Sequence, residues 1–101
     1  MNNEYQEELE KLRHSIDAID DVLYRTLEFR VATTTKIGEL KKKHGISEMS
    51  MDRRDEIYKK LKDWAMEDGI PVTLVTRIYD IIFEYSVLEQ VLIINENRDM
   101  D

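Results

Sequence analysis

The sequence predicts an all-α fold of three helices, and two observations support this prediction. Glycine and proline are scarce, with three and one in 101 residues, and 37% of the residues are charged, which is typical of long helices. Apolar residues recur at helical spacing along three stretches, which are separated by breaks at Gly45 and at Gly69 to Pro71. A chain of this length forms a single domain, residues 1–101, and we expect its polar tail, residues 96–101, to be frayed.

The first helix is expected from about Glu4 to Lys43, followed by Gly45 as a left-handed C-cap. Its apolar seam consists of two heptad lines, which are Leu9, Ile16, Leu23, Arg30 and Ile37, and Leu12, Ile19, Thr26, Thr33 and Leu40. About 40 helical residues span roughly 60 Å, whereas a compact 100-residue chain has a radius of gyration near 13 Å. Two shorter helices cannot cover this face, so we expect an intertwined homodimer with an interface at Leu9, Ile16 and Leu23.

The second and third helices are expected at about Ser50 to Glu67 and Val72 to Asn95. The apolar face of the second helix contains Ile57, Leu61, Trp64 and Ala65. Ser86 and Gln90 lie one turn apart on an otherwise apolar stripe of the third helix, so we expect both to face inward and to need polar partners. The five methionines and Trp64 are expected to fill the core.

The composition argues against several functional classes. There is no cysteine, which excludes disulfides and thiolate chemistry. The net charge of −7 argues against nucleic acid as a partner, because phosphate binding needs a basic stripe. No apolar run approaches the roughly 20 residues of a membrane span, and the N-terminus has no signal sequence, so we expect a cytoplasmic protein without a membrane partner. His14 and His44 lack the spacing of a metal pair, so no metal is expected.

Arg30 interrupts the apolar seam of the first helix, where a guanidinium is costly unless an anion meets it. A salt bridge to a neighbouring helix and a buried stem with a solvated head are alternative explanations. Lys41 follows three turns later, within roughly 20° of the same face. Two cations on one buried face indicate an anion site. Arg13 is turned by about 100° from Arg30 and lies about 25 Å away along the helix, so it can reach such a pocket only in a partner chain.

Five elements of the sequence together resemble the all-helical class of chorismate mutase. They are Leu12-Arg13-His14-Ser15-Ile16-Asp17-Ala18-Ile19-Asp20, Arg30, Ile37-Gly38-Glu39-Leu40-Lys41, Arg53, and Ser86-Val87-Leu88-Glu89-Gln90. The resemblance covers about Leu9 to Val91 without a gap. It implies a homodimer with shared active sites, an isomerase that rearranges chorismate to prephenate in phenylalanine and tyrosine synthesis, and no cofactor.

The resemblance also implies roles for individual residues. Arg13 of the partner chain and Arg30 would clamp the two substrate carboxylates, and Lys41 and Gln90 would hydrogen-bond the ether oxygen of the breaking bond. The remaining implied contacts are a charge network supported by Arg53, a carboxylate contact by Ser86, a ring-hydroxyl contact by the Ser50 backbone, and apolar walls from Ile37, Phe83 and Val87. The chemistry fits, because a unimolecular pericyclic reaction needs only a held conformer and donors where charge develops.

Arg54 departs from the family pattern, which usually has a substrate-binding glutamate at this position for the ring hydroxyl. Asp55 lies a further 100° around the helix and is a poor substitute. Arg54 is therefore expected either to turn outward or to donate to the hydroxyl itself. An isochorismate-pyruvate lyase remains an alternative, because some members of that related group lack the glutamate. An amino-substituted chorismate is disfavoured, since its ammonium would be repelled by Arg54. A non-catalytic helical dimer module is the third alternative.

Overall fold

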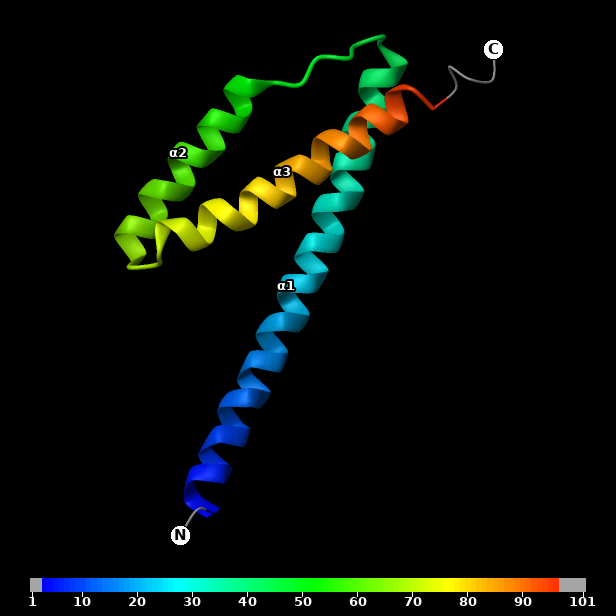
Figure 1. Cartoon of the computed structure of the whole chain (residues 1–101). Helices are drawn as coiled ribbons and strands as arrows, with labels where there is room; N and C mark the ends of the chain where they lie inside the picture. Colours follow the sequence, from blue (N-terminus) through cyan, green and yellow to red (C-terminus); the bar gives the residue numbers. More distant parts are fainter. Residues whose placement is uncertain (1–2, 97–101) are drawn as a thin grey trace. The chain divides into compact units, whose positions relative to one another are not determined.

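The chain folds into three α-helices in a computed structural model that describes residues 3–96. They are α1 (Asn3–Lys43), α2 (Met51–Asp68) and α3 (Val72–Ile94), shown in Figure 1. The all-α prediction is confirmed, and each helix begins and ends within one residue of its expected position. The expected frayed tail, beyond residue 96, lies outside the described residues. Within residues 3–96, no helix combines the length and apolarity that a membrane span requires.

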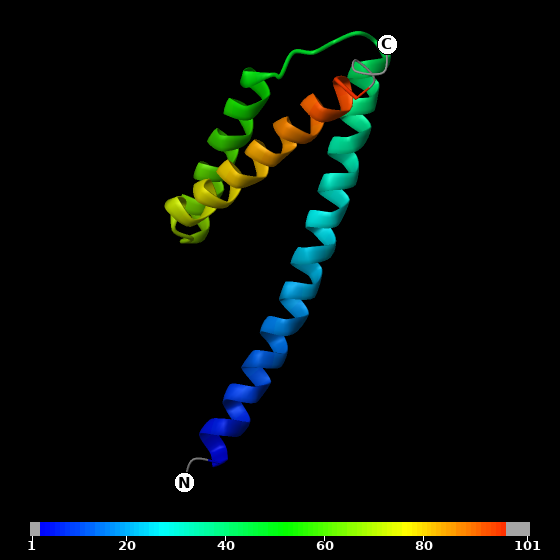
Figure 2. The same ribbon diagram turned by 45° about the vertical axis from the view of Figure 1, so that its right-hand side comes forward.

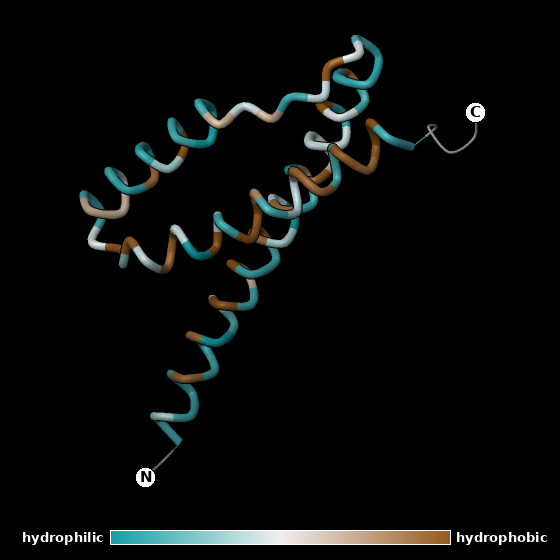
Figure 3. The backbone as a smooth tube through the Cα atoms, turned by 45° about the horizontal axis from the view of Figure 1, so that its top comes forward, coloured by the Kyte–Doolittle hydropathy of each residue, from teal (hydrophilic) through white to brown (hydrophobic). Residues whose placement is uncertain are grey.

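The described chain divides into two compact units, with the boundary between Thr33 and Thr34. The N-terminal unit is residues 3–33 of α1, and its side chains are exposed except for the half-buried Leu9 and Arg30. The predicted apolar seam therefore lies on the surface of this unit, as the exposed fractions of 65% for Leu12 and 55% for Ile16 indicate. Figure 3 shows hydrophobic segments recurring among hydrophilic ones along this helix.

The C-terminal unit begins with the last turns of α1, which close in a glycine-dependent cap. Gly45 has a φ of 67°, and its N–H donates to the carbonyl of Lys42 at 3.2 Å. The N–H of Ile46 donates to the carbonyl of Lys41 at 2.8 Å. These two bonds form a Schellman motif, so the predicted C-cap is confirmed.

The remaining helices of this unit form an α2–α3 hairpin with a small core. The Ser50 hydroxyl accepts from the backbone N–H of Arg53 at 3.2 Å and caps α2. α2 ends at Asp68 with Gly69, which has a φ of 72°, as its C-cap, and α3 runs back from Val72 after Pro71 (Figure 1). Leu61 and Ala65 are the buried hydrophobic residues of the described chain.

A close approach between α1 and α3 completes the unit, and Gly38 permits it. Gly38 is buried, and a Cβ at this position would lie 3.0 Å from Ile93 Cδ1 and 3.4 Å from Gln90 Cα. The Thr35 hydroxyl donates to the Glu89 carboxylate beside this contact. Figure 2 shows the end of α1 next to the end of α3. The approach brings Lys41, one turn beyond Gly38, to α3.

The expectation that Trp64 and the methionines fill the core is wrong for the described chain, except that Met49 is half-buried. Trp64 is 51% exposed and Met66 is 73% exposed, and Met51 is exposed as well. The reason is that the inward face of α2 is the one with the buried Leu61 and Ala65, whereas Trp64 and Met66 lie on faces that the described chain leaves exposed. The ammonium of Lys60 lies 5.0 Å from the centroid of the Trp64 ring, a cation–π contact at the surface.

Candidate functional site

Lys41 lies at the centre of a polar cluster formed by α1, α3 and the connection before α2. Its half-buried ammonium donates to Gln90 Oε1 at 2.7 Å and to the carbonyl of Glu48 at 2.9 Å, and it contacts Met49 Sδ at 3.5 Å. An ammonium has three donors, and all three of these acceptors are neutral. The positive charge of Lys41 is therefore positioned without being neutralised by them, which suits the binding of an electron-rich oxygen.

Gln90 is the second donor of this cluster, and its contact with Lys41 orients it. The side chain is buried, with 9% exposed, on a helix that Gly38 brings close to α1. Its amide oxygen accepts from Lys41, so its Nε2 group presents two N–H donors on the other side of the amide. The pair therefore offers a cationic donor and a neutral donor from two different helices. The prediction that Gln90 faces inward and has a polar partner is confirmed.

Ser86 lies one turn before Gln90 on α3 and is half-buried, as expected. Its hydroxyl donates to the carbonyl of Ile82 at 2.8 Å. The first turn of α2 carries the other two polar residues expected in the site. Ser50 caps this turn, while Arg53 is 65% exposed and forms an ion pair with Glu56 at 3.2 Å. Arg53 is therefore paired within its own helix rather than with Lys41 or Gln90.

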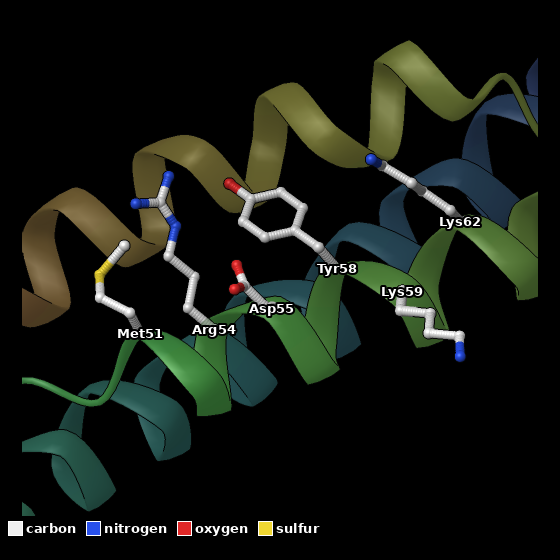
Figure 4. Close-up of a pocket in the computed structure, with 6 residues that line it drawn as sticks. All are labelled: Met51, Arg54, Asp55, Tyr58, Lys59 and Lys62. Carbon is white, nitrogen blue, oxygen red and sulfur yellow. The ribbon is translucent and has the colours of Figure 1, made fainter.

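Arg54 turns toward α3 rather than outward. Its half-buried guanidinium lies 5.4 Å from the ring centroid of Tyr58 and 6.0 Å from that of Phe83. Figure 4 shows Arg54 and Tyr58 both pointing toward α3, whereas Lys59 points away from it. Cation–π contacts with two rings fix the guanidinium. Of the two orientations expected for Arg54, the outward one is therefore wrong.

Tyr58 lies one turn after Arg54 on α2, and its side chain contacts α3. Its hydroxyl donates to the carboxylate of Asp80, and its ring lies 5.3 Å from that of Phe83. Burial and the hydrogen bond to Asp80 raise the pKa of the Tyr58 hydroxyl above its ordinary value, while the Arg54 guanidinium acts in the opposite direction. Sequence reasoning missed Tyr58 and Asp80. The spacing of four residues between Arg54 and Tyr58 was an available signal, but the partnership with Asp80 depends on the α2–α3 register.

A pocket of about 530 Å³ lies along this part of α2 (Figure 4), and its lining residues are Met51, Arg54, Asp55, Tyr58, Lys59 and Lys62. Three cations and one carboxylate line it, so it is a positive patch on a chain with a net charge of −7. Arg54 is the only residue of the sequence-predicted site in this lining. Two of its lining residues, Met51 and Arg54, are therefore sequence neighbours of Ser50 and Arg53, but the lining does not include Lys41 or Gln90.

The two arginines expected to bind carboxylates belong to the N-terminal unit. Arg13 is 63% exposed by side chain and forms an ion pair with Glu10 at 3.2 Å, whereas Arg30 is half-buried. The expected walls belong to the C-terminal unit, where Phe83 is half-buried while Ile37 and Val87 are exposed. Among residues 3–96 no group of three or more histidine, aspartate or glutamate side chains could hold a metal ion.

Comparison with known proteins identifies one family and one similar enzyme. Residues 12–91 match the family model described as chorismate mutase type II. The chain is 29% identical over 77 residues to a protein of Streptomyces venezuelae named 4-amino-4-deoxychorismate mutase, and the match covers 76% of this chain and 75% of that protein. No solved structure matches the chain.

Proposed function

The chain belongs to the chorismate mutase type II family and is an isomerase of that type, and we propose that its reaction is the rearrangement of chorismate to prephenate in phenylalanine and tyrosine synthesis. The observation that supports this proposal most strongly is the Lys41–Gln90 pair. It places a charged donor 2.7 Å from a buried amide, with neutral acceptors around the ammonium. Such a pair suits a reaction in which negative charge develops on one uncharged oxygen.

The proposed mechanism assigns the bond-breaking step to these two side chains. In the rearrangement the ether C–O bond breaks while a C–C bond forms within the same molecule, so no proton, electron or leaving group is exchanged with the enzyme. Charge develops on the ether oxygen, and Lys41 Nζ and Gln90 Nε2 donate to it. A preorganised donor of this kind lowers a barrier by about 2.7–4 kcal/mol, because it is already oriented when the charge appears.

We further propose that a second copy of the chain completes the site. The N-terminal unit exposes an apolar stripe at helical spacing, formed by Leu12, Ile16, Ile19 and Leu23. A homodimer would cover this stripe and would bring Arg13 of the partner subunit toward the polar cluster around Lys41. Arg13 and Arg30 would then clamp the two carboxylates and hold the folded conformer. The cytoplasmic location expected from the sequence stays a prediction.

Turnover of chorismate tests the proposed reaction directly. Purified protein, checked for helicity and oligomeric state, is incubated with chorismate while the absorbance of the substrate is followed, and prephenate is identified by mass spectrometry. We expect the absorbance to fall and prephenate to accumulate in equal amount. A correctly folded dimer that leaves chorismate unchanged would refute the proposal. Isochorismate, supplied in a parallel reaction, tests the lyase alternative through release of pyruvate.

A second candidate substrate is 4-amino-4-deoxychorismate, and the name of the Streptomyces venezuelae relative favours it. Charge argues the other way, because the Arg54 guanidinium would repel an ammonium but can donate to a hydroxyl oxygen. The contacts of Arg54 with Tyr58 and Phe83 hold that charge in place. We therefore propose that Arg54 favours the hydroxyl-bearing substrate.

The ratio of kcat/KM for the two substrates tests this preference. Arg54→Gln removes the charge and should shift the ratio toward the amino substrate by about tenfold, since like charges a few ångströms apart near a protein surface interact by more than 1 kcal/mol. Lys60→Gln makes the same charge change at an exposed residue of α2 outside this pocket lining, where the ammonium lies against the Trp64 ring, and should leave the ratio unchanged. Equal ratios in the wild type and Arg54→Gln would show that Arg54 does not select the substrate.

A further inference from the structure

Met49 occupies a donor of Lys41 that the proposed reaction needs. Two of the three Lys41 contacts are strong oxygen acceptors, at 2.9 Å to the Glu48 carbonyl and 2.7 Å to Gln90 Oε1. The third is the thioether of Met49 at 3.5 Å, and a thioether sulfur is a weak acceptor. An incoming ether oxygen can displace this weak contact at little cost, whereas displacing the carbonyl or the amide would lose a strong hydrogen bond.

The position of Met49 makes such a displacement physically reasonable. Met49 lies in the connection between α1 and α2, where it is half-buried and one residue before the Ser50 cap. Its neighbour Glu48 supplies the carbonyl that holds Lys41, so the same short segment carries both contacts. The unbranched methionine side chain has three rotatable bonds and can leave while the backbone stays in place.

We propose that Met49 is an oxidation-sensitive positioning residue, whose thioether occupies the third donor of Lys41 in the empty site and whose sulfoxide blocks that donor. The proposal deepens the proposed function, because it rests on Lys41 binding the ether oxygen. Oxidation by a peroxide forms an S–O bond and breaks the O–O bond, so the thioether becomes a sulfoxide and hydrogen peroxide becomes water. The sulfoxide oxygen is a strong acceptor, and substrate would have to compete with it for the ammonium.

Two methionine-to-leucine variants give the matched comparison. Leucine keeps the volume and apolar character of methionine but removes the acceptor. Met49→Leu should lower the KM for chorismate by about 2- to 5-fold, the range of one weak hydrogen bond lost to competition. Met66→Leu alters an exposed methionine of α2. The described contacts of Lys41 do not include Met66, so this variant should leave KM unchanged.

Peroxide treatment of the intact enzyme tests the proposal. Wild type and Met66→Leu should show a rise in KM on the order of 10-fold or more, as expected for a hydrogen bond to a charged donor. Methionine sulfoxide reductases should reverse the rise, and Met49→Leu should resist it. Mass spectrometry of peptides must show that sulfoxide at Met49 accumulates with the inhibition. If Met49→Leu is as sensitive as wild type, or if inhibition precedes oxidation of Met49, the proposal is wrong.

A measurement without turnover separates this proposal from the proposed function. In protein carrying ¹³C-methyl methionine, the Met49 signal is the one lost in Met49→Leu. Lys41→Gln should shift this signal and leave that of Met66 in place, because the ammonium contacts Met49 and has no described contact with Met66. A Met49 signal that does not respond would overturn the contact itself. Absence of chorismate turnover in untreated wild type would instead overturn the proposed function, whatever the methyl spectrum shows.

Discussion

The two units of the chain differ in how many of the contacts they need are made within a single copy of the chain. In residues 3–33, the hydrogen bonds of Arg13, Ser15 and Arg25 link positions three or four residues apart on the same helix. In the C-terminal unit, by contrast, Lys41 bonds to Gln90 across two helices, and Tyr58 bonds to Asp80 across two others. The N-terminal unit has the periodicity of a packed helix but exposes its apolar stripe, whereas the C-terminal unit already contains an ordered polar cluster.

This contrast indicates where each part of the activity originates. An isolated helix is marginal in water and takes most of its stability from packing of its apolar face. Burying one large aliphatic side chain contributes about 1.5–3 kcal/mol, so a stripe of four such residues on each copy is a strong driving force for association. We infer that the C-terminal unit supplies the donors for the chemistry, while the N-terminal unit supplies dimerisation and the carboxylate clamp.

The largest expected effect is that of Lys41→Gln on the polar cluster. Removing the cation should lower kcat by about 10²–10³, the typical loss for one oriented donor at a developing charge. Lys42→Gln is the matched control, because Lys42 is next in the chain but pairs with Glu96 at 3.5 Å. Its kcat should stay within about twofold of wild type, as expected for a surface ion pair. Turnover and circular dichroism of both variants check this, and a near-normal kcat in Lys41→Gln would remove Lys41 from the mechanism.

The next largest effect concerns the N-terminal unit. Ile16→Asp places a charge in the exposed apolar stripe and should dissociate the dimer, because an interface cannot bury an unpaired carboxylate without losing several kcal/mol. His14→Asp introduces the same residue two positions away on the opposite side of the helix and should leave the dimer intact. Sedimentation equilibrium distinguishes the two variants. A dimer that survives Ile16→Asp would show that this stripe is not the interface.

The sequence was sufficient to predict the helices, their ends and the inward face of α3, because each depends on local rules. Gly45 follows a run of cations, and Ser86 and Gln90 interrupt an apolar stripe, so both signals are visible in the chain itself. The contacts of Glu48 and Met49 with Lys41 were not predicted, since they depend on the path of an irregular segment. The core was overestimated at Trp64, because periodicity identifies an apolar face but does not identify what covers it.

A smaller effect is expected at the α1–α3 contact. Gly38→Ala normally favours a helix by about 1 kcal/mol, but here the new Cβ would meet Ile93 Cδ1 at 3.0 Å. Overpacking of this kind costs about 1–3 kcal/mol, so the variant should be slightly destabilised and should lose turnover as Gln90 moves from Lys41. Ile93→Val removes that Cδ1 atom, and the double variant should regain both stability and turnover. Thermal unfolding and kinetics of the wild type, the two single variants and the double variant check this. A double variant that is as unstable and as slow as Gly38→Ala would contradict the steric explanation.

The smallest expected effect is the alkaline behaviour of Tyr58. Its pKa is raised by burial and by the bond to Asp80, so the folded protein holds the phenolic proton more tightly than the unfolded chain does. The stability from this bond is therefore fully present below the unfolded pKa of about 10 and is lost as pH rises through the higher folded value. Tyr58→Phe should reduce the fall in melting temperature between about pH 9 and 11. An unchanged pH dependence in this variant would show that the hydrogen bond adds no linked stability.

We propose that one catalytic site combines Lys41 of one subunit with Arg13 of the other, and subunit mixing tests this arrangement most directly. Arg13→Ala and Lys41→Gln proteins, each nearly inactive alone, are unfolded together in equal amounts and refolded. If the sites are shared, each mixed dimer has one intact site and one doubly altered site, so activity should return to about one quarter of wild type. If each site lies within a single chain, every site keeps one substitution and the refolded mixture should stay as inactive as its parents.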